Sequence, residues 1–357
     1  MSKIECKCEI YINGRFLARK VSGVERFSIE ITKELLKLDP RIKVIAPQKA
    51  KPQKELNHSD VVYKGIFSGH FWEQIILPFF LKRKSKALLL NFANTSPLFC
   101  KQKITTLHDI AFKDHPEWFS EKFSVYYNFL IPRLLKTSKH IFTVSEFSKK
   151  RIHEQFTIPP DKISVIYNGV SSVFTKSNPN KKPFDFNYYL TVGTLQPRKN
   201  LKRLMEAYHQ IPHPKNKLVI VGNINTIFED DNNELKPDQD VIIKENVNDT
   251  ELCALYKYAE KFIYPSLYEG FGLPVLEAIY FSCPVVASNI HVFRELFGDT
   301  IGYFNPYDIQ SIKEGIEKKP YFSENSELIK QIKKYNFATS AKQILGIIED
   351  KKDSICA

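Results

Sequence analysis

The chain has 357 residues, of which 43% are hydrophobic and 26% charged, a composition typical of a soluble protein with about two domain cores. Its apolar runs are far shorter than the ~20 residues of a membrane span, and no N-terminal stretch has the pattern of a signal peptide. The net charge of +12 suits phosphorylated substrates or anionic lipid, and no nucleic-acid-binding signature accompanies it. We therefore expect a cytoplasmic protein, peripheral on a membrane at most, without a nucleic acid partner.

Short β-branched runs alternate with helical patterns along the chain. The predicted strands are 43–47, 87–92, 104–109, 140–145 and 163–169, then 188–193, 217–222, 240–247, 261–266 and 284–288. The predicted helices are 23–38, 121–136, 146–156, 200–210, 250–259, 274–282 and 291–297. Continuous apolar strands separated by helices indicate parallel sheets that are covered on both faces.

The alternating pattern occurs twice, and a polar, proline-containing segment at 171–187 separates the two occurrences. We therefore predict two doubly wound, Rossmann-like α/β domains, at 1–172 and 186–334, that face a cleft. Open sheets of this kind bind ligands beyond the carboxyl ends of their strands, so the cleft is the expected site. The last segment, 335–357, is predicted to be helical and to pack back across the domains.

The six cysteines are scattered, and only Cys6 and Cys8 lie close together in the sequence. A zinc site usually needs four ligands at recurring short spacings, so free thiols and no metal are expected. The densest basic cluster, LKRKSK at 81–86, directly follows the aromatic and apolar stretch WEQIILPFF at 72–80. This order suits an interfacial segment on an anionic membrane, and it equally suits a buried helix with a solvated basic end.

Two stretches of the first half carry candidate site residues. In SGVERFSIEI, 22–31, Gly23 opens a helix whose first backbone N–H groups can approach a phosphate or sugar, as an ordinary glycine-containing connection also would. His108 and Asp109 stand where a predicted strand ends. His108 can hydrogen-bond a sugar hydroxyl, although a lone histidine at a strand end is more often structural.

The stretch TVGTLQPRKNLKRLMEAY, 191–208, points to a phosphate site. Gly193 permits a tight turn, and Arg198 and Lys199 come just before a helix predicted to begin near Asn200. Cations oppose the helix dipole at this end, where acidic residues are favoured. A choice that opposes local stability argues for a ligand, and two cations at a helix N-terminus suit a diphosphate.

The stretch YPSLYEGFGLPVLEAI, 264–279, places seven residues between Glu269 and Glu277. Glu277 is predicted to fall in the first turn of a helix that starts near Pro274, where a carboxylate stabilises the dipole by about 0.3–1 kcal/mol. Glu269 lies in a glycine-flanked loop after a strand, where no dipole explains it. The stretch indicates a polyhydroxylated or phosphorylated ligand and leaves the reaction open.

Several stretches together resemble family 4 of the retaining glycosyltransferases, which have the two-domain GT-B fold. They are GVERF, GHFWEQIILP, LHDIAFKDHPEWFS, VSEFSKK, VIYNGV, VGTLQPRKNL and YPSLYEGFGLPVLEA. The resemblance covers nearly the whole chain, and the Glu-x7-Glu spacing is its most specific element. The variants GVERF and HPEWFS look most like bacterial mannosyl- and rhamnosyltransferases of surface-polysaccharide assembly, including lipopolysaccharide.

The resemblance implies a role for each candidate residue. Arg198 and Lys199 would neutralise the donor's diphosphate, Glu277 would bind the ribose, and Glu269 would lie beside the transferred sugar. His108 would lie near the hydroxymethyl group of that sugar. The remaining implied donor-binding positions are Gly23, Gly193, Val247, Gly270, Phe271, Gly272 and Leu273.

The resemblance also implies the reaction. It is a retaining, metal-independent hexosyl transfer without a cofactor, from a nucleotide diphosphate sugar, with GDP-mannose or dTDP-rhamnose favoured. The acceptor is a glycan or lipid-linked glycan that attacks from the face the diphosphate leaves, which makes Glu269 a positioning residue.

Two alternatives stay open. A sugar-nucleotide epimerase of similar fold would interconvert a donor without any acceptor, and a non-catalytic nucleotide-sugar-binding protein would bind a donor without turnover. One departure from the family pattern concerns NFATSA at 336–341, which lacks the tryptophan often found at the start of the last helix. That leaves the packing of the last helix open.

Overall fold

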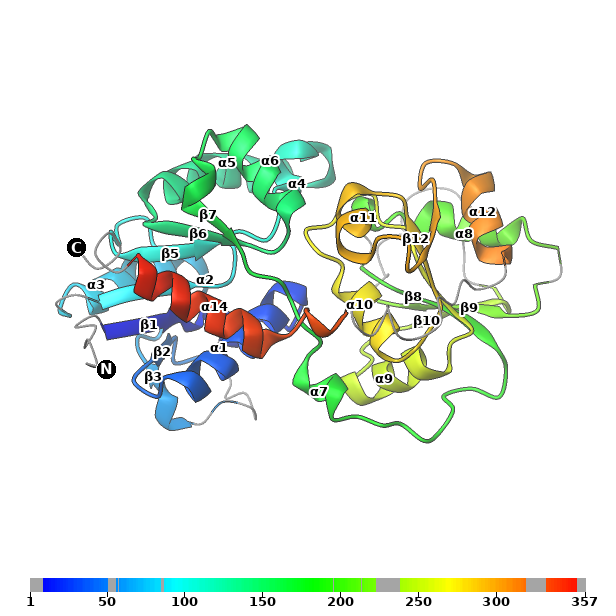
Figure 1. The fold of residues 1–357 in the computed structure, drawn as a ribbon, viewed down its shortest axis with the longest axis horizontal. Coiled ribbons are helices and arrows are strands. Elements are labelled where there is room, and N and C mark those ends of the chain that lie inside the picture. Colours follow the sequence, from blue (N-terminus) through cyan, green and yellow to red (C-terminus); the bar gives the residue numbers. More distant parts are fainter. Residues whose placement is uncertain are drawn as a thin grey trace. The chain divides into compact units, whose positions relative to one another are not determined.

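The computed structural model describes residues 9–50, 56, 58–84, 87–194, 196–212, 214–222, 238–318 and 332–351. The chain divides into two compact units, which we describe separately. The N-terminal unit comprises Met1–Gly169 and Tyr335–Ala357, and the C-terminal unit comprises Val170–Lys334. Each unit is built on one parallel sheet with helices on both faces, so the predicted pair of doubly wound α/β folds is confirmed (Figure 1).

The sheet of the N-terminal unit has the strand order β3-β2-β1-β4-β5-β6-β7. Its strands are β1 (Glu9–Asn13), β2 (Lys43–Ala46), β3 (Val61–Tyr63), β4 (Ala87–Asn91), β5 (Lys103–Thr106), β6 (His140–Thr143) and β7 (Ile163–Val165). β1 and β3 were not among the predicted strands, because EIYIN mixes polar and apolar residues and VVY is very short. The strand order reverses between β1 and β4, which makes their carboxyl ends the expected place for a ligand.

Helices cover both faces of this sheet. They are η1 (Gly14–Ala18), α1 (Gly23–Leu38), η2 (His58–Asp60), α2 (Gly69–Phe71), the π-helical η3 (Trp72–Ile76), α3 (Leu77–Leu81), α4 (Ala111–Asp114), η4 (Pro116–Trp118), α5 (Glu121–Thr137), α6 (Glu146–Phe156), η5 (Pro160–Lys162) and α14 (Phe337–Asp350). The final helix α14 lies beside α1 (Figure 1). Phe337 contacts the ring of Phe27, and the hydroxyl of Ser340 donates to the carbonyl of Tyr167 at 2.7 Å. Phe337 at the start of this helix is buried, so the last helix packs on the N-terminal unit without a tryptophan.

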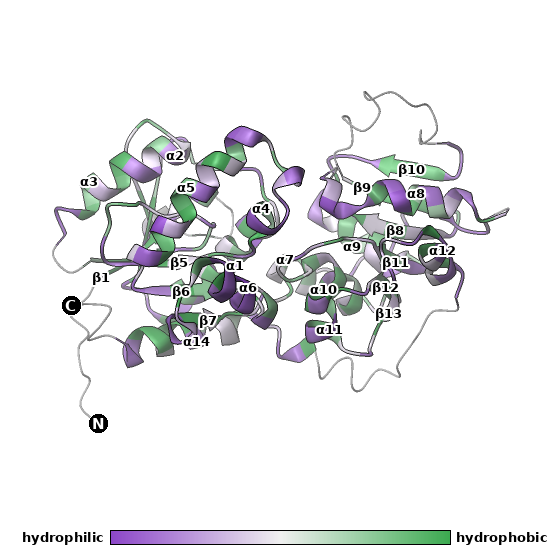
Figure 2. Ribbon diagram, turned by 90° about the horizontal axis from the view of Figure 1, so that it is seen from above, coloured by the Kyte–Doolittle hydropathy of each residue, from purple (hydrophilic) through white to green (hydrophobic). Residues whose placement is uncertain are grey.

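The sheet of the C-terminal unit has the order β10-β9-β8-β11-β12-β13, and its strand order reverses between β8 and β11. Its strands are β8 (Tyr188–Val192), β9 (Lys217–Val221), β10 (Val241–Lys244), β11 (Lys261–Tyr264), β12 (Val285–Ser288) and β13 (Gly302–Phe304). Its helices are α7 (Ser172–Thr175), η6 (Pro197–Lys199), α8 (Leu201–His209), α9 (Asp249–Tyr258), α10 (Leu273–Tyr280), α11 (His291–Phe297) and α12 (Ile309–Glu317). Leu204 of α8 and Ile312 of α12 pack with Ile220 of β9 in one core cluster. Helices of both units show a hydrophobic and a hydrophilic side (Figure 2).

The predicted linker at 171–187 is partly folded. It contains α7, whose Phe174 is fully buried against Tyr256 and Phe281 of the C-terminal unit. The polar sequence around a single aromatic residue gives no periodic signal, so only the tertiary contacts show that this segment packs. Across the ranges described above, no helix is long and apolar enough to cross a membrane.

Candidate active site

The carboxyl ends of β8 and β11 bring two predicted motifs together. These strands pair side by side, so the loops that follow them are neighbours. The backbone N–H of Leu267 donates to the carbonyl of Arg198 at 2.7 Å and ties the two loops to each other. The candidate residues Arg198, Lys199 and Glu269 consequently converge at the strand-order reversal of the C-terminal unit, where open α/β sheets bind ligands.

Glu269 is the centre of this cluster. Its carboxylate is buried, with the residue only 7% exposed. The ammonium group of Lys199 lies 2.5 Å from Oε1, and Nη1 of Arg198 lies 3.3 Å from Oε2. The hydroxyls of Tyr264 and Ser266 also donate to Oε1, at 2.9 and 2.7 Å. Four side chains therefore hold one carboxylate in place.

Charges in the cluster determine its ionisation. Burial alone would raise the pKa of Glu269, but the charges of Lys199 and Arg198 outweigh it and hold this pKa at about 2. Burial, with the nearby Glu269 charge, raises the pKa of Tyr264 well above its ordinary value, so that hydroxyl stays protonated and donates. Two cations face one carboxylate at the edge of the sheet, an arrangement of charge that suits an anionic ligand.

Arg198 and Lys199 lie in η6, just before α8, which begins at Leu201, so the predicted place of both cations ahead of this helix is confirmed. Asn200 between them and the helix has a left-handed backbone, with φ of 56°. Its side chain donates to the carbonyl of Pro306 at 2.8 Å and does not cap the helix. The first amides of α8 therefore receive no acceptor from the Asn200 side chain and remain suited to an anion.

Glycines shape the backbone around the cluster. Gly272 has φ of 107°, and a Cβ there would lie 2.6 Å from the ring of Phe293. The amide of Gly193 donates to the carbonyl of Val221 at 2.9 Å. A Cβ on Gly222 would lie 1.8 Å from the carbonyl oxygen of Gly193, so the loops after β8 and β9 approach as closely as only glycine allows.

Glu277 differs from its sequence interpretation. It is the fifth residue of α10, which begins at Leu273, so the first turn holds no acidic residue and the dipole explanation of Glu277 is wrong. The helix starts one residue before Pro274, which takes the second helical position. Glu277 is 7% exposed and accepts a hydrogen bond from the hydroxyl of Tyr256 at 2.9 Å.

Comparisons with known proteins agree with this geometry. Two family models match the chain, Glycosyltransferase Family 4 over residues 21–173 and Glycosyl transferases group 1 over residues 173–338. The O-antigen chain mannosyltransferase RfbU of Salmonella typhimurium is 31% identical over 279 residues, which cover 77% of this chain and 76% of that protein. The chain belongs to glycosyltransferase family 4. The predicted family is therefore confirmed, and the chain is a glycosyltransferase that uses a nucleotide sugar donor.

Other relatives of this glycosyltransferase are similar in kind. The O-antigen chain mannosyltransferase B of Escherichia coli is 32% identical over 234 residues, 60% of each chain. Among solved structures, Anabaena HepE in complex with UDP and glucose has a TM-score of 0.70 at 18% identity, covering 96% of this chain and 99% of HepE. WaaG, a glycosyltransferase involved in lipopolysaccharide biosynthesis, has a TM-score of 0.65 at 14% identity, covering 94% of each chain. These likenesses show the GT-B fold.

The other predicted donor-site residues of the glycosyltransferase spread over several loops. Gly270, Phe271, Gly272 and Leu273 form the connection into α10, with Phe271 buried. Val247 is half-buried in the connection between β10 and α9. These positions belong to the same unit as Glu269, and their roles toward a donor stay predictions.

Gly23 and His108 lie in the N-terminal unit of the glycosyltransferase. Gly23 is the exposed first residue of α1, and the ring of His108 contacts Phe27 on the same helix. Nε2 of His108 lies 2.9 Å from the carbonyl oxygen of Phe92. Burial lowers the pKa of His108, so the imidazole is neutral at neutral pH. It therefore offers a hydrogen bond rather than a charge.

Sequence reasoning missed three hydroxyls that the glycosyltransferase uses to hold its carboxylates, those of Tyr264, Ser266 and Tyr256. Tyr264 and Ser266 lie in the stretch YPSLYEG, and their closeness to Glu269 in the sequence could have indicated that they contact its carboxylate. Tyr256 lies 21 residues from its partner Glu277, and nothing in the local pattern marks it. Among the described residues, no three His, Cys, Asp or Glu side chains group as metal ligands. Cys100, Cys253 and Cys283 are free thiols, while Cys6, Cys8 and Cys356 lie outside the described residues.

Proposed function

We propose that this glycosyltransferase moves a hexose or deoxyhexose, with mannose favoured over rhamnose, from a nucleotide diphosphate sugar to a glycan or lipid-linked glycan. The transfer retains the anomeric configuration, needs no metal, and serves cell-surface polysaccharide synthesis in the cytoplasm. The choice of mannose, and so of GDP-mannose before dTDP-rhamnose, follows the relatives named as O-antigen mannosyltransferases. The free thiols support a reducing compartment.

One observation carries the proposal: the paired cations Arg198 and Lys199 on the buried carboxylate of Glu269. As the bond from the sugar's anomeric carbon to the diphosphate oxygen breaks, negative charge develops on that oxygen. Fixed cations at that point stabilise the transition state more than the ground state, without a metal ion.

The contacts of Glu269 support a positioning role. Its Oε1 already accepts from Lys199, Tyr264 and Ser266, so few lone pairs are left to attack a sugar carbon. With its pKa held at about 2, the group carries no proton to give to a leaving group at neutral pH. Glu269 therefore orients the two cations rather than forming a covalent intermediate.

A panel of nucleotide sugars tests the donor. GDP-mannose is expected to raise the melting temperature most, because a ligand at about 100 times its Kd stabilises by about 2.7 kcal/mol. Incubation with octyl α-D-mannoside and EDTA should then yield an α-linked product, read from the anomeric proton in NMR spectra. Donor epimerisation without acceptor, or a melting temperature that no nucleotide sugar raises, would contradict the proposal.

An exposed apolar stripe on the N-terminal unit supports contact with an anionic membrane. Phe71, Ile75 and Phe79 recur every four residues along α2, η3 and α3, and they are 54%, 52% and 64% exposed. The opposite side of the same segment is buried through Trp72 and Leu77. One face of this segment therefore enters the core, as the buried-helix alternative expects, and the other presents apolar side chains to solvent.

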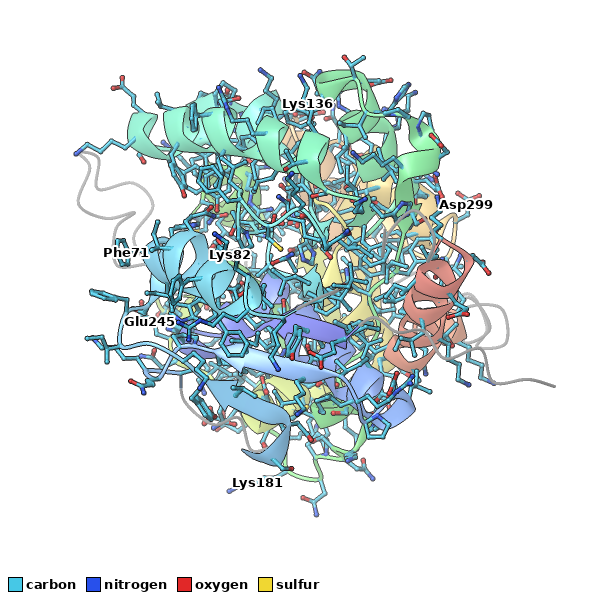
Figure 3. All side chains as sticks on the ribbon, turned by 90° about the vertical axis from the view of Figure 1, so that its left-hand side faces the viewer. Phe71, Lys82, Lys136, Lys181, Glu245 and Asp299 are labelled. Carbon is cyan, nitrogen blue, oxygen red and sulfur yellow. The ribbon has the colours of Figure 1, made fainter. Side chains whose placement is uncertain are left out.

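Basic side chains continue this segment. Lys82, Arg83 and Lys84 follow α3 and are exposed, and the guanidinium of Arg83 lies 4.9 Å from the ring centre of Phe79. Figure 3 shows Phe71 and Lys82 on this segment, with Phe71 at the rim of the molecule. Ser85 and Lys86 of the predicted basic cluster lie outside the described residues. Apolar side chains beside cations match an anionic headgroup layer over acyl chains.

Co-sedimentation with vesicles tests the membrane contact. Binding to vesicles with phosphatidylglycerol should exceed binding to phosphatidylcholine vesicles, and it should weaken with added salt. The double change Lys82→Gln and Arg83→Gln should weaken binding about 30-fold, at about 1 kcal/mol for each charge. Tyr307→Ser, which removes an exposed aromatic side chain of the C-terminal unit, is the control and should change nothing. Equal binding to both vesicle types would refute an electrostatic contact.

A further inference from the structure

A second buried carboxylate lies at the carboxyl edge of the other sheet. Glu73 of η3 is fully buried, and its Oε1 lies 3.1 Å from Nε of Arg15. The amide of Asn13, the last residue of β1, donates to Oε1 at 2.8 Å, and the hydroxyl of Thr95 donates to Oε2 at 2.7 Å. Asn13 also donates to Asn91 at the end of β4. The network therefore sits where the strand order of the N-terminal unit reverses.

Stability alone is a weak reason for such a network. A buried ion pair is often no more stabilising than apolar residues of the same volume, because both charges lose their hydration. Burial would raise the pKa of Glu73, but the charge of Arg15 keeps it below its ordinary value, so the carboxylate is ionised. Arg15 already neutralises this charge and is itself held by Thr95 at 2.8 Å.

His70 nevertheless faces this carboxylate. Its Nδ1 is inaccessible to solvent and lies 3.5 Å from Oε2 of Glu73. The side chain as a whole is 38% exposed, so part of the ring other than Nδ1 meets solvent. A carboxylate that faces Nδ1 favours the proton on that nitrogen and leaves the Nε2 lone pair to accept a hydrogen bond.

The surroundings of His70 suit a sugar. The ring of Tyr126 on α5 meets the His70 ring edge-to-face at 5.2 Å and is 37% exposed, which offers an apolar wall beside the hydrogen-bond acceptor. Small-molecule sites typically combine aromatic walls with a few fixed polar groups. A pyranose has hydroxyls that donate and an apolar ring face, so it matches both features.

We infer that His70 and Tyr126 form a subsite for a pyranose of the acceptor, in which Nε2 of His70 accepts a hydrogen bond from a sugar hydroxyl. Glu73 is a positioning residue that orients the imidazole through Nδ1. This inference rests on the proposed function, because it concerns the acceptor of the same transfer. It involves no step in which His70 forms or breaks a covalent bond.

Steady-state kinetics with GDP-mannose and octyl α-D-mannoside test the subsite. His70→Ala should raise the KM for octyl mannoside about tenfold, as expected for one lost hydrogen bond, and leave the KM for GDP-mannose unchanged. His70→Gln should restore most of the affinity, because its carbonyl oxygen reaches the place of Nε2. His70→Asn, whose shorter side chain replaces only Nδ1, should not restore it.

A matched control is available in the same unit. His115 pairs with Glu117 at 3.1 Å and has a side chain 34% exposed, so His115→Ala removes a comparable histidine and should change neither KM. Glu73→Gln should raise the acceptor KM in wild type and add nothing in the His70→Ala background, since it acts through His70. If Glu73→Gln does not fold, the three His70 variants still decide the question.

The outcomes separate the two proposals. An acceptor KM for His70→Ala within twofold of wild type, or an equal rise in both KM values, overturns the subsite and leaves the proposed function standing. A wild-type protein that transfers mannose neither to octyl mannoside nor to octyl N-acetylglucosaminide overturns the proposed function and this inference with it.

Discussion

Replacing Lys199 by alanine is expected to lower kcat for sugar transfer by about 10²–10³-fold, the range measured when one fixed donor to a developing oxyanion is removed. Lys199 contacts both Glu269 and the hydroxyl of Tyr264, so its ammonium group is held before a donor arrives. That preorganisation matters because no reorganisation is then needed when charge develops on the leaving diphosphate. The measurement is the initial rate with GDP-mannose and octyl mannoside.

The variant must be separated from a folding defect. Lys202→Ala removes an exposed lysine from the first turn of α8, three residues along the chain, and should leave kcat unchanged. Lys199→Ala keeps Arg198 at 3.3 Å from Glu269, so the carboxylate retains one counter-charge and the fold should persist. A folded Lys199→Ala protein with more than half of the wild-type kcat would remove Lys199 from the mechanism.

Acid should destabilise the C-terminal unit through Glu269. The pKa of this carboxyl is 4.5 in the unfolded chain and about 2 in the folded one. The contribution of ionised Glu269 to the free energy of unfolding is therefore complete above pH 4.5, declines as the pH falls toward 2, and is absent below that. A lowering of this size corresponds to about 3 kcal/mol, at about 1.4 kcal/mol for each pKa unit.

Two spectroscopic signals distinguish the units in this experiment. Both tryptophans, Trp72 and Trp118, belong to the N-terminal unit. A change in far-UV circular dichroism that leaves tryptophan fluorescence unchanged therefore reports unfolding of the C-terminal unit. Urea unfolding gives the free energy of unfolding of wild type and of Glu269→Gln at pH 7 and pH 2.5. Wild type should be the more stable protein at pH 7 and should lose most of this difference at pH 2.5. Glu260→Gln controls for the loss of one exposed carboxylate. A difference in the free energy of unfolding between wild type and Glu269→Gln that is the same at both pH values would falsify the assigned ion pairs.

The two carboxylate clusters of this glycosyltransferase are built alike. In each, a buried glutamate after a parallel strand is held by an arginine and by hydroxyl or amide donors, Glu269 by Arg198 and Glu73 by Arg15. Only the first was predicted as a site, because its residues contradict local helix preferences and recur in a family pattern. Glu73 stands in a quoted stretch, GHFWEQIILP, but its partners Asn13 and Thr95 lie 60 and 22 residues away.

Some errors of local interpretation have a common cause. The first turn of α10 was placed around Glu277, because a proline marks a helix start only to within a few residues. β1, β3 and β13 escaped prediction because EIYIN mixes polar and apolar residues and the other two strands are only three residues long. The folded part of the linker, around Phe174, depends on an aromatic pocket from α9 and the end of α10.

The sequence by itself determined the fold class and the family, and it selected Arg198, Lys199 and Glu269 as candidate site residues. The fold class follows from periodicity and the family from its resemblance to several short motifs. The candidate residues follow from turn chemistry, from side chains that oppose local stability and from the same resemblance, all of which lie within short stretches of chain. Only the tertiary structure decided that both cations bind Glu269, that Tyr264 and Ser266 complete its contacts, and that His70 faces Glu73. The reason is strand order: it places distant loops side by side, and no local pattern specifies that order.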